Sequence, residues 1–211
     1  KKYIKYFNYN KRKVKGKKTM LDTSPRVILV QNVGLFSVGD SLNASKIAGD
    51  LTETNARVIS SVEETTKYKF IPEKDLFDVE YWSLEQAKIK KPKKILQGNV
   101  VVITGGFGAI GTETYKLFKS YGAEVVLLDY NEKKVKEMQS KIKDLCLHCD
   151  VRNKNSVKKA FRIISEQYGG IDILISNAGT AIGGSIAEVD DKILRKSFED
   201  NFFSHQNCAS E

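Results

Sequence analysis

The feature that most constrains the fold is an alternation of apolar runs and amphipathic segments from residue 95 onward. The apolar runs lie at 99–104, 123–129, 145–151 and 171–176. The first, second and fourth are almost continuously apolar, which is typical of strands buried on both faces of a parallel sheet. Helical spacing of apolar residues separates the runs, and one more helix is predicted from Asp190 to about Cys208. The alternation predicts βαβ units, so the fold class is α/β, a Rossmann-type doubly wound parallel sheet of about four strands.

The part of the chain before this alternation is predicted to be mostly helical, with one short strand. The run at 25–30 is short and apolar, as a buried strand would be, and the stretch "NVGLFSVGD" (32–40) is typical of a loop. Apolar residues recur at helical spacing from Ser41 to about Thr66, which predicts a helix there. Pro72 suits a helix start, and a further helix is predicted across Val79–Lys90.

A glycine-rich turn joins the first predicted strand of the sheet to the helix after it. Gly106, Gly108 and Gly111 have the spacing G-x-G-x-x-G at the start of a βαβ unit. Small residues there let backbone N–H groups and the positive end of the helix dipole approach a pyrophosphate. Asp129 ends the second predicted strand, where a carboxylate accepts hydrogen bonds from a ribose diol. The pattern predicts a dinucleotide site. The alternative is a tight structural turn with an aspartate that caps the next helix.

The net charge raises nucleic-acid binding as another candidate function. The chain has a formal net charge of +9, and nine of its 35 basic residues lie in 1–20, a segment without acidic residues. The other 26 basic residues balance the 26 acidic ones, so the basicity belongs to this segment and not to the body of the chain. Aromatic residues alternate with cations there, as stacking on bases would require. We favour a solvated connector with no nucleic-acid partner, because the segment brings no binding fold with it.

Cysteine usage favours a reducing compartment. The chain has three cysteines, an odd number, which argues against a disulfide framework. Cys146 and Cys149 form C-x-x-C, but positions three apart on a strand point to opposite faces, so we favour buried strand cysteines over a metal or redox pair. Neither a signal peptide nor an apolar stretch of membrane-spanning length is found. We therefore expect a cytoplasmic protein with no membrane partner.

The motifs of the second half resemble those of the short-chain dehydrogenase/reductase family. The glycine signature of that family, T-G-x-x-x-G-x-G, is matched by residues 104–111, with Ala109 in place of the middle glycine. Asp150 and Val151 match the Asp-Val pair that comes after the third strand of the family. Residues 176–179 match its N-N-A-G segment, with serine for the first asparagine. Asn201 matches the asparagine that orders the catalytic water network in the family.

The resemblance implies a nicotinamide cofactor, NAD, and names the residues that bind it. These are Gly105, Gly106, Gly108, Ala109, Ile110, Gly111, Asp129, Tyr130, Asp150, Val151, Asn177, Ala178 and Gly179. The carboxylate of Asp129 would repel the 2′-phosphate of NADP. We therefore expect NAD to be preferred at least tenfold, which requires about 1.4 kcal/mol. We expect Lys133 and Lys134, at the start of the next helix, to point to solvent.

The catalytic serine and the Tyr-x-x-x-Lys pair of the family come after the segment that holds Asn201. Three Tyr-x-x-x-Lys matches occur here by chance and none has the right place: Tyr9/Lys13, Tyr115/Lys119 and Tyr130/Lys134. The chain ends at Glu211, before a fifth strand. We therefore expect an incomplete domain that is inactive by itself.

The N-terminal part resembles the segment that joins the two halves of bifunctional class II aldolase/short-chain dehydrogenases of the rhamnulose-1-phosphate aldolase/alcohol dehydrogenase type. The resemblance is carried by "PRVILVQNVGLFSVGDS" and "LFDVEYWSLEQAK". It implies a basic connector at 1–20, an inter-domain segment at 21–94 and the NAD-binding domain at 95–211. The only histidines are His148 and His205, so no zinc centre is expected.

Two classes of function are consistent with the sequence. The resemblance implies an NAD-dependent oxidoreductase of carbohydrate metabolism, acting on a small sugar-derived alcohol or aldehyde such as lactaldehyde, and a homo-oligomer at full length. The alternative is a non-catalytic dinucleotide-binding or interaction module with a basic arm.

Overall fold

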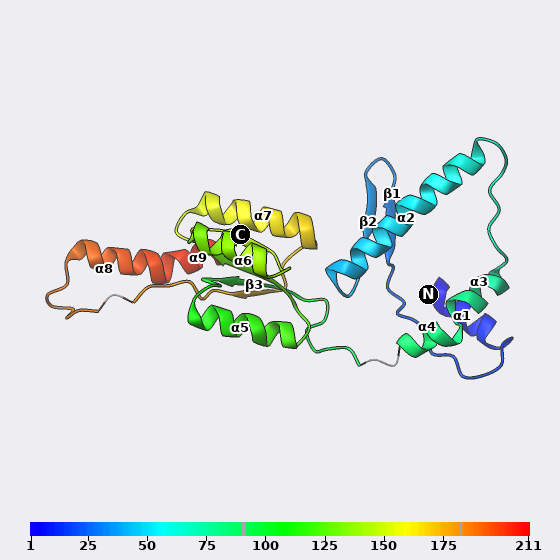
Figure 1. Ribbon diagram of the computed structural model, residues 1–211, viewed down its shortest axis with the longest axis horizontal. Helices are drawn as coiled ribbons and strands as arrows, with labels where there is room; N and C mark the ends of the chain where they lie inside the picture. The colour runs from blue at the N-terminus through cyan, green and yellow to red at the C-terminus, as the bar shows by residue number, and fades with distance from the viewer. Residues whose placement is uncertain (90–91, 182) are drawn as a thin grey trace. The chain divides into compact units, whose positions relative to one another are not determined.

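The chain forms two compact units, residues 1–93 and residues 94–211. The computed structural model describes residues 1–89, 92–181 and 183–211. In Figure 1 the first unit runs from blue to the first greens, and the second runs from green to red.

The second unit contains a parallel sheet of four strands, as the sequence predicted. The strands are β3 (Val100–Thr104), β4 (Glu124–Asp129), β5 (Cys146–His148) and β6 (Ile173–Ile175). Their order is β5-β4-β3-β6, and all neighbours pair in parallel. Every residue of β3 is buried, whereas β6 lies at the edge of the sheet and is only half-buried. The order reverses direction between β3 and β6, which makes the carboxyl ends of these two strands a topological switch point.

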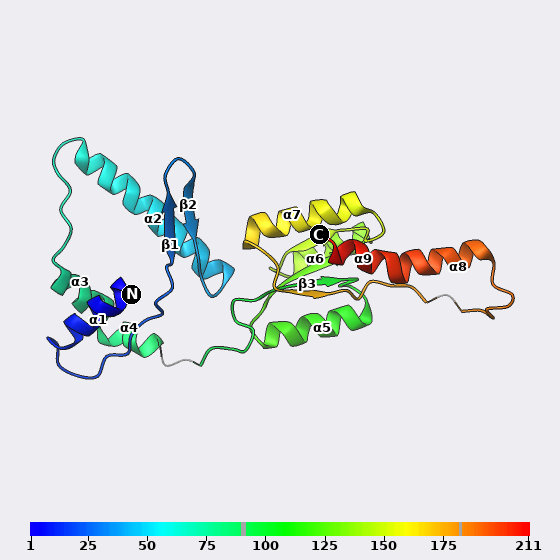
Figure 2. The ribbon, with the colours of Figure 1, turned by 180° about the vertical axis from the view of Figure 1, so that it is seen from behind.

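Helices cover both faces of this sheet. Both views show α5 (Ala109–Ser120) and α7 (Lys154–Tyr168) on opposite sides of the strands (Figures 1 and 2). Side chains of α5 and of α6 (Glu132–Lys141) pack in one core cluster, and side chains of α7 pack in the other. The continuous apolar runs of the strands are therefore explained by a layer of helices on each side.

The two cysteines of the C-x-x-C motif lie in different cores. Cys146 belongs to the cluster beneath α5 and α6, and Cys149 belongs to the cluster beneath α7. This confirms the prediction that the two side chains point to opposite faces of the sheet. Among the described residues no group of histidine, cysteine or carboxylate side chains is placed to hold a metal ion.

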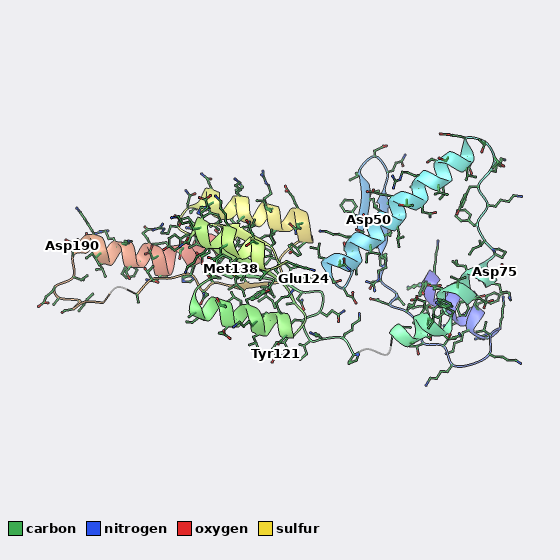
Figure 3. The ribbon with its side chains drawn as sticks, viewed as in Figure 1. Asp50, Asp75, Tyr121, Glu124, Met138 and Asp190 are labelled. Carbon is green, nitrogen blue, oxygen red and sulfur yellow. The ribbon has the colours of Figure 1, made fainter. Side chains whose placement is uncertain are left out.

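The predicted helix from Asp190 to Cys208 forms, but with an irregular turn inside it. Helix α8 (Asp191–Phe198) is continued by a π-helical turn, η1 (Glu199–Phe203), and by α9 (Ser204–Ala209). Asp190, labelled in Figure 3, accepts a hydrogen bond from the Lys192 N–H and so caps α8. The side-chain amide of Asn201 donates to the Ser197 carbonyl, which offers that carbonyl a partner outside the regular helical pattern.

The first unit begins with a helix that the sequence analysis did not predict. Residues 1–20 were expected to be a solvated connector, but α1 (Lys2–Lys11) buries Phe7 and Asn10. Phe7 packs with Phe77 and Tyr81 of the segment around α3 (Glu73–Glu80). The lysine-rich composition masked an aromatic face at helical spacing, and that face supplies a core.

The helix predicted across Val79–Lys90 is two short helices. Pro72 precedes α3, as expected, and α4 (Ser83–Lys88) begins after a break at Tyr81 and Trp82. Tyr81 has non-helical backbone angles and is fully buried against Phe77, with ring centroids 4.5 Å apart. Burial of this ring fixes the break. Lys90, the predicted end of the helix, lies outside the described residues.

The remaining part of the first unit is a hairpin and a long helix. The sequence predicted a buried strand at 25–30 and then a loop, but the structure has two antiparallel strands, β1 (Val27–Val30) and β2 (Gly34–Ser37). Asn32 takes a left-handed φ of 61°, a turn signal that the prediction overlooked. The hairpin is not buried, and the side chain of Leu29 is 73% exposed.

Helix α2 (Leu42–Glu63) confirms the helix predicted from Ser41, and it lies beside the hairpin. Ser41 caps this helix by accepting a hydrogen bond from the Ala44 N–H at 3.1 Å. Within the described part of the chain, no helix is long and apolar enough to cross a membrane.

Candidate functional site

A cleft of about 520 Å³ lies at the carboxyl ends of the parallel strands. Each strand contributes a residue at its end or within two residues after it to the lining: Gly105, Asp129, Cys149 and Asn177. Ligands of open parallel sheets bind at this edge, beside the switch point. The cleft is therefore the candidate functional site of the described chain.

The glycine-rich turn contributes in two different ways. Gly105 and Gly108 line the cleft, together with Ala109 and Ile110. Gly106 and Gly111 do not line it. A Cβ on Gly106 would lie 2.8 Å from Leu127 Cδ2, and a Cβ on Gly111 would collide with the Gly105 carbonyl oxygen. The sequence analysis assigned all of these residues to cofactor approach. In the structure, the lack of a side chain at Gly106 and Gly111 allows the turn to pack tightly against the sheet and against itself.

The N-terminus of α5 opens onto the cleft without a side-chain cap. Three other helices come after strands of the sheet, and each is capped by a side chain that accepts a backbone N–H: α6 by Asn131, α7 by Asn153 and α8 by Asp190. The first N–H groups of a helix have no partner within the helix, and together with the helix dipole they attract an anion. The uncapped end of α5 is thus suited to a phosphate group.

Asp129 brings a buried carboxylate to the same cleft, at the end of β4. Its Oδ2 accepts a hydrogen bond from the Phe107 N–H at 3.2 Å, and its Oδ1 accepts one from the Asn131 N–H at 3.0 Å. These bonds fix the carboxylate beside the glycine turn and leave each oxygen with a further lone pair. Tyr130, the next residue, lines the cleft and is 68% exposed.

A cluster of hydrogen bonds joins the ends of β3 and β6 at the switch point. The buried Thr104 hydroxyl accepts hydrogen bonds from the N–H groups of Asn177 and Ala178, both at 3.0 Å. The side-chain amide of Asn177 donates to the carbonyls of Thr104 and Gly105. Asn177, Ala178 and Gly179 all line the cleft. The sequence analysis assigned no role to Thr104, but in the structure its side chain positions the wall of the cleft formed by Asn177, Ala178 and Gly179.

Asp150 and Val151, two of the predicted cofactor residues, line the cleft after β5, and Arg152 lines it beside them. The Arg152 guanidinium binds both carboxylate oxygens of Asp150, Nε to Oδ1 at 2.9 Å and Nη2 to Oδ2 at 2.8 Å. These hydrogen bonds lower the pKa of the Asp150 carboxyl below its ordinary value. Asp150 is thus held as an anion in one orientation.

Asn201 does not line the cleft but lies directly behind its wall. Its Oδ1 accepts a hydrogen bond from the Thr180 N–H, and its Nδ2 donates to the Thr180 carbonyl, both at 2.9 Å. Thr180 and Asp200, the neighbour of Asn201, do line the cleft. The Thr180 hydroxyl donates to Asp200 Oδ2 at 2.8 Å.

Sequence reasoning missed seven residues of the lining: Asn131, Lys134, Cys149, Arg152, Thr180, Lys196 and Asp200. Most of them stand next to a predicted site residue, so adjacency on the same loop was the signal that could have found them. Lys134 was expected to point to solvent; it is exposed, and it also lines the cleft.

Two of the chance Tyr-x-x-x-Lys matches lie in the second unit. Tyr115 and Lys119 both bind the carboxylate of Asp144, at 2.7 Å each. Burial and this carboxylate raise the pKa of Tyr115, which is the opposite of what a proton-transferring tyrosine requires. Tyr130 and Lys134 line the cleft at the end that holds Asp129.

Neither histidine belongs to a group of metal-ligating side chains in the described part of the chain. His205 Nδ1 is hydrogen-bonded to the hydroxyl of Ser176, the serine that replaces the first asparagine of the family segment. His148 ends β5 and is exposed.

Two family profiles match the chain, and together they cover nearly all of it. The profile described as "short chain dehydrogenase" matches residues 99–211, and the profile described as "Aldolase class II, second domain" matches residues 1–89. The second match includes the lysine-rich residues 1–20 and so agrees with their place in a folded unit.

Individual relatives match parts of the chain. The uncharacterized oxidoreductase YuxG of Bacillus subtilis is 30% identical over 178 residues, which make up 80% of this chain and 26% of that protein. Short-chain dehydrogenase reductase 3b of Arabidopsis thaliana is 40% identical over 89 residues, 41% of this chain and 35% of that protein.

A solved structure shows the same fold. The crystal structure of a short-chain dehydrogenase/reductase described as glucose/ribitol dehydrogenase, from Brucella melitensis, has a TM-score of 0.52 at 23% identity. It covers 56% of this chain and 52% of that one. The chain spans about a quarter of the length of the Bacillus relative and about a third of the Arabidopsis one. Because the dehydrogenase profile matches more than half of its residues, the chain belongs to the short-chain dehydrogenase family.

Proposed function

We propose that the chain binds NAD in the cleft and supplies the cofactor site of an NAD-dependent dehydrogenase. One observation carries this proposal. The uncapped N-terminus of α5 and the buried carboxylate of Asp129 open onto the same cleft at the switch point of a parallel sheet. A helix N-terminus attracts a pyrophosphate, and a carboxylate at the end of the neighbouring strand accepts the hydroxyls of a ribose. A dinucleotide carries both groups.

The residues that would hold the cofactor are assigned from their places in the cleft. The N–H groups of Ala109 and Ile110 would hold the pyrophosphate, and Asp129 the adenosine ribose. The walls after β5 and β6 would hold the two rings, with Asp150 on one side and Asn177 to Gly179 on the other. When bound, the nicotinamide ring would accept a hydride from an alcohol or donate one to an aldehyde. The role of Asn201 as an ordering residue for catalytic water remains part of this proposal.

The proposal favours NAD over NADP. A 2′-phosphate would meet the Asp129 carboxylate, which backbone N–H groups hold in place. Lys134 lines the same part of the cleft and offsets part of that repulsion. Its side chain is flexible and exposed, whereas the carboxylate is buried and fixed, so the carboxylate dominates. We expect a preference for NAD of at least tenfold, or about 1.4 kcal/mol.

Titration of the 211-residue chain with NADH and NADPH, monitored by the fluorescence of the reduced nicotinamide, tests this assignment. Asp129→Ala should weaken NADH binding and reduce the preference over NADPH. Asp78→Ala, an exposed aspartate of the first unit that pairs with Lys74, is the matched control and should change neither. Equal affinity of the unsubstituted chain for the two cofactors would show that the role given to Asp129 is wrong.

For the longer protein we propose a bifunctional aldolase/dehydrogenase. The aldolase second-domain match at residues 1–89 supports it, together with the identity to the Bacillus oxidoreductase across both units. The proposed substrate is a sugar-derived alcohol or aldehyde such as lactaldehyde. We further propose a homo-oligomer in the cytoplasm, without nucleic-acid or membrane partners, and the three free cysteines support the reducing compartment.

A second candidate is a dinucleotide-binding module without catalysis. It is favoured by the state of Tyr115 and Lys119, which Asp144 ties down on α5. Tyr130 and Lys134 do line the cleft, but beside the carboxylate proposed for the adenosine ribose. An assay of NADH formation from a three-carbon alcohol distinguishes the candidates. Binding without turnover by the 211-residue chain, with turnover by a longer chain, supports the dehydrogenase. Binding without turnover by both supports the module.

A further inference from the structure

We propose that Arg152 is a positioning residue that couples the two walls of the cleft. On the wall after β5, Arg152 holds the carboxylate of Asp150. On the wall after β6, it contacts Asp200 of the turn η1, which also carries Asn201 and is bonded to Thr180. The identity of the ligand in this inference rests on the proposed function, whereas the network itself rests on the contacts of the chain.

The first link is the bond between Arg152 and Asp150. The carboxylate accepts three hydrogen bonds from this one residue, two from the guanidinium and one from the backbone N–H at 3.1 Å. A bidentate guanidinium–carboxylate pair fixes direction as well as charge, which a lysine ammonium would not do. The orientation of Asp150 in the cleft is therefore set by Arg152.

The second link is the contact between Arg152 and Asp200. Arg152 Nη1 lies 3.6 Å from Asp200 Oδ1, and the other oxygen of Asp200 accepts the Thr180 hydroxyl. The Asp200 side chain is only 7% exposed, whereas that of Arg152 is 43% exposed. Burial of a carboxylate costs free energy, and an apolar residue would fill the same place without that cost. The contact with the Arg152 guanidinium therefore explains why a carboxylate, and not an apolar side chain, is buried at position 200.

The third link passes from Thr180 to Asn201. Both backbone polar groups of Thr180 are bonded to the Asn201 side chain, so the loop after β6 and the turn η1 move as one. Gly179 permits this approach, since a Cβ there would lie 2.6 Å from Asn201 Oδ1. A separate contact ties the same helical segment to the loop after β5: the Asn207 side chain donates to the carbonyls of Val151 and Arg152.

The consequence is a cleft whose two walls are joined by the contact of Arg152 with Asp200, in addition to the hydrogen bonds of Asn207. The loop after β5 holds Asp150 and Arg152, and the loop after β6 with η1 holds Thr180, Asp200 and Asn201. A ligand that contacts Asp150 therefore meets a carboxylate whose position depends on the far wall. Loss of the guanidinium should loosen both walls together, although Arg152 contributes little to the core.

The experiment measures NADH binding by the 211-residue chain and its variants. Arg152→Gln should weaken binding about tenfold, a loss of about 1.4 kcal/mol. Asp200→Asn keeps an acceptor for the Thr180 hydroxyl but removes the charge that faces Arg152, and it should weaken binding less. In the double variant the two effects should not add, because both break the same link. Arg152→Lys restores the charge and should recover part of the affinity. Arg162→Gln, which removes an exposed ion pair with Glu166 on α7, should have no effect.

Hydrogen exchange at the Thr180 amide gives a readout that does not require the ligand. Arg152→Gln should speed its exchange, Arg162→Gln should not, and the urea midpoint should stay the same in both. Additive binding losses, or unchanged protection of Thr180 in Arg152→Gln, would overturn the coupling. If the chain does not bind NADH but Thr180 protection still depends on Arg152, the proposed function fails and the coupling stands. If Arg152→Gln fails to fold, the exchange rate in Arg152→Lys decides.

Discussion

Two short runs of similar composition, "VILV" in β1 and "VVVIT" in β3, have opposite fates in the two units. Every side chain of β3 is buried, while three of the four in β1 are exposed. The difference comes from the segment that the chain forms after each run. After β3, crossovers place helices on both faces of a four-stranded sheet, whereas β1 turns back at once into β2. Apolar composition predicts a strand, and connectivity decides whether that strand has a second layer to bury it.

The same contrast holds for the helices of the two units. Helix α7 buries Val157, Ala160, Phe161 and Ile164 against the sheet. Helix α2 is longer but has no buried residue, and its Leu51 is 66% exposed. The core of the first unit is instead a small aromatic cluster between α1 and α3. We therefore expect the two units to respond very differently to the same substitution.

The largest expected effect is a leucine-to-alanine change in each unit. Leu128 is fully buried in β4, so Leu128→Ala should destabilise the second unit by about 3 kcal/mol. Leu29 is mostly exposed in β1, so Leu29→Ala should change the stability of the first unit by less than about 0.5 kcal/mol. Hydrogen exchange under increasing urea, read separately for peptides of each unit, measures both. Equal losses would show that the hairpin is buried in solution and would break the comparison.

The next effect tests the polar contact at the switch point. Thr104→Val keeps the shape of the buried side chain but leaves the N–H groups of Asn177 and Ala178 without their acceptor. An unpaired buried N–H costs about 1–3 kcal/mol, so we expect the second unit to lose about 2 kcal/mol. Thr104→Ser keeps the hydroxyl and should lose less. Faster exchange of the two amides in the valine variant alone would locate the effect. If the valine and serine variants lose equally, the methyl group matters and the hydroxyl does not.

Much of the second unit could be predicted from its sequence, because the hydrophobic pattern and the short motifs indicated the same fold. The alternation of runs indicated the strands and the helices between them, and the glycine turn with Asp129 indicated the place of the cleft. The lining residues that family motifs do not fix were missed, Arg152 and Asp200 among them. Their roles depend on a meeting of two loops that are far apart in sequence. No local pattern reports such a meeting.

Less of the first unit could be predicted, for a physical reason that Phe7 illustrates. This side chain sits in a lysine-rich segment that composition marks as solvated, yet it is only 4% exposed. Its burial depends on Phe77 and Tyr81, about seventy residues further along the chain. The hairpin was missed because its turn is marked only by two residues with positive φ, Asn32 and Gly34, within a stretch that was interpreted as a loop.

A smaller effect concerns how the stability of the second unit depends on pH, because all three cysteines lie in that unit. Burial raises the pKa of the Cys208 thiol from its ordinary value of 9.0 to about 11. The pKa of Cys208 is higher in the folded state than in the unfolded state. The contribution of this thiol to the free energy of unfolding is therefore complete below pH 9 and is lost as the pH rises toward 11. When the pH is raised from 7 to 10, the free energy of unfolding of the second unit should therefore fall by about 1 kcal/mol less in Cys208→Ala than in the unsubstituted chain. The same loss in both would show that other groups, such as Tyr168, account for it.

The smallest expected effect is none, and it concerns the basic residues of α1. Nucleic-acid binding needs rings that are free to stack as well as cations. Phe7 is buried in α1, and the hydroxyls of Tyr3 and Tyr6 are bound to Glu80, which turns these rings toward the core. Tyr9 is exposed, but the Lys13 ammonium lies 3.5 Å from its ring centroid. The exposed face therefore offers cations without a stacking platform.

The test replaces four exposed cations, Lys2, Lys5, Arg12 and Lys13, with glutamine. This variant keeps the aromatic core of the first unit, which deletion of the segment would destroy. At about 0.15 M salt, where the screening length is about 8 Å, it should bind a random single-stranded oligonucleotide no more weakly than the unsubstituted chain. Micromolar binding that the four substitutions abolish would contradict us. Its dependence on salt would show it most clearly, because four phosphate contacts give a logarithmic slope of about −3 on single strands. In that case the exposed face of α1 would be a nucleic-acid surface on the first unit.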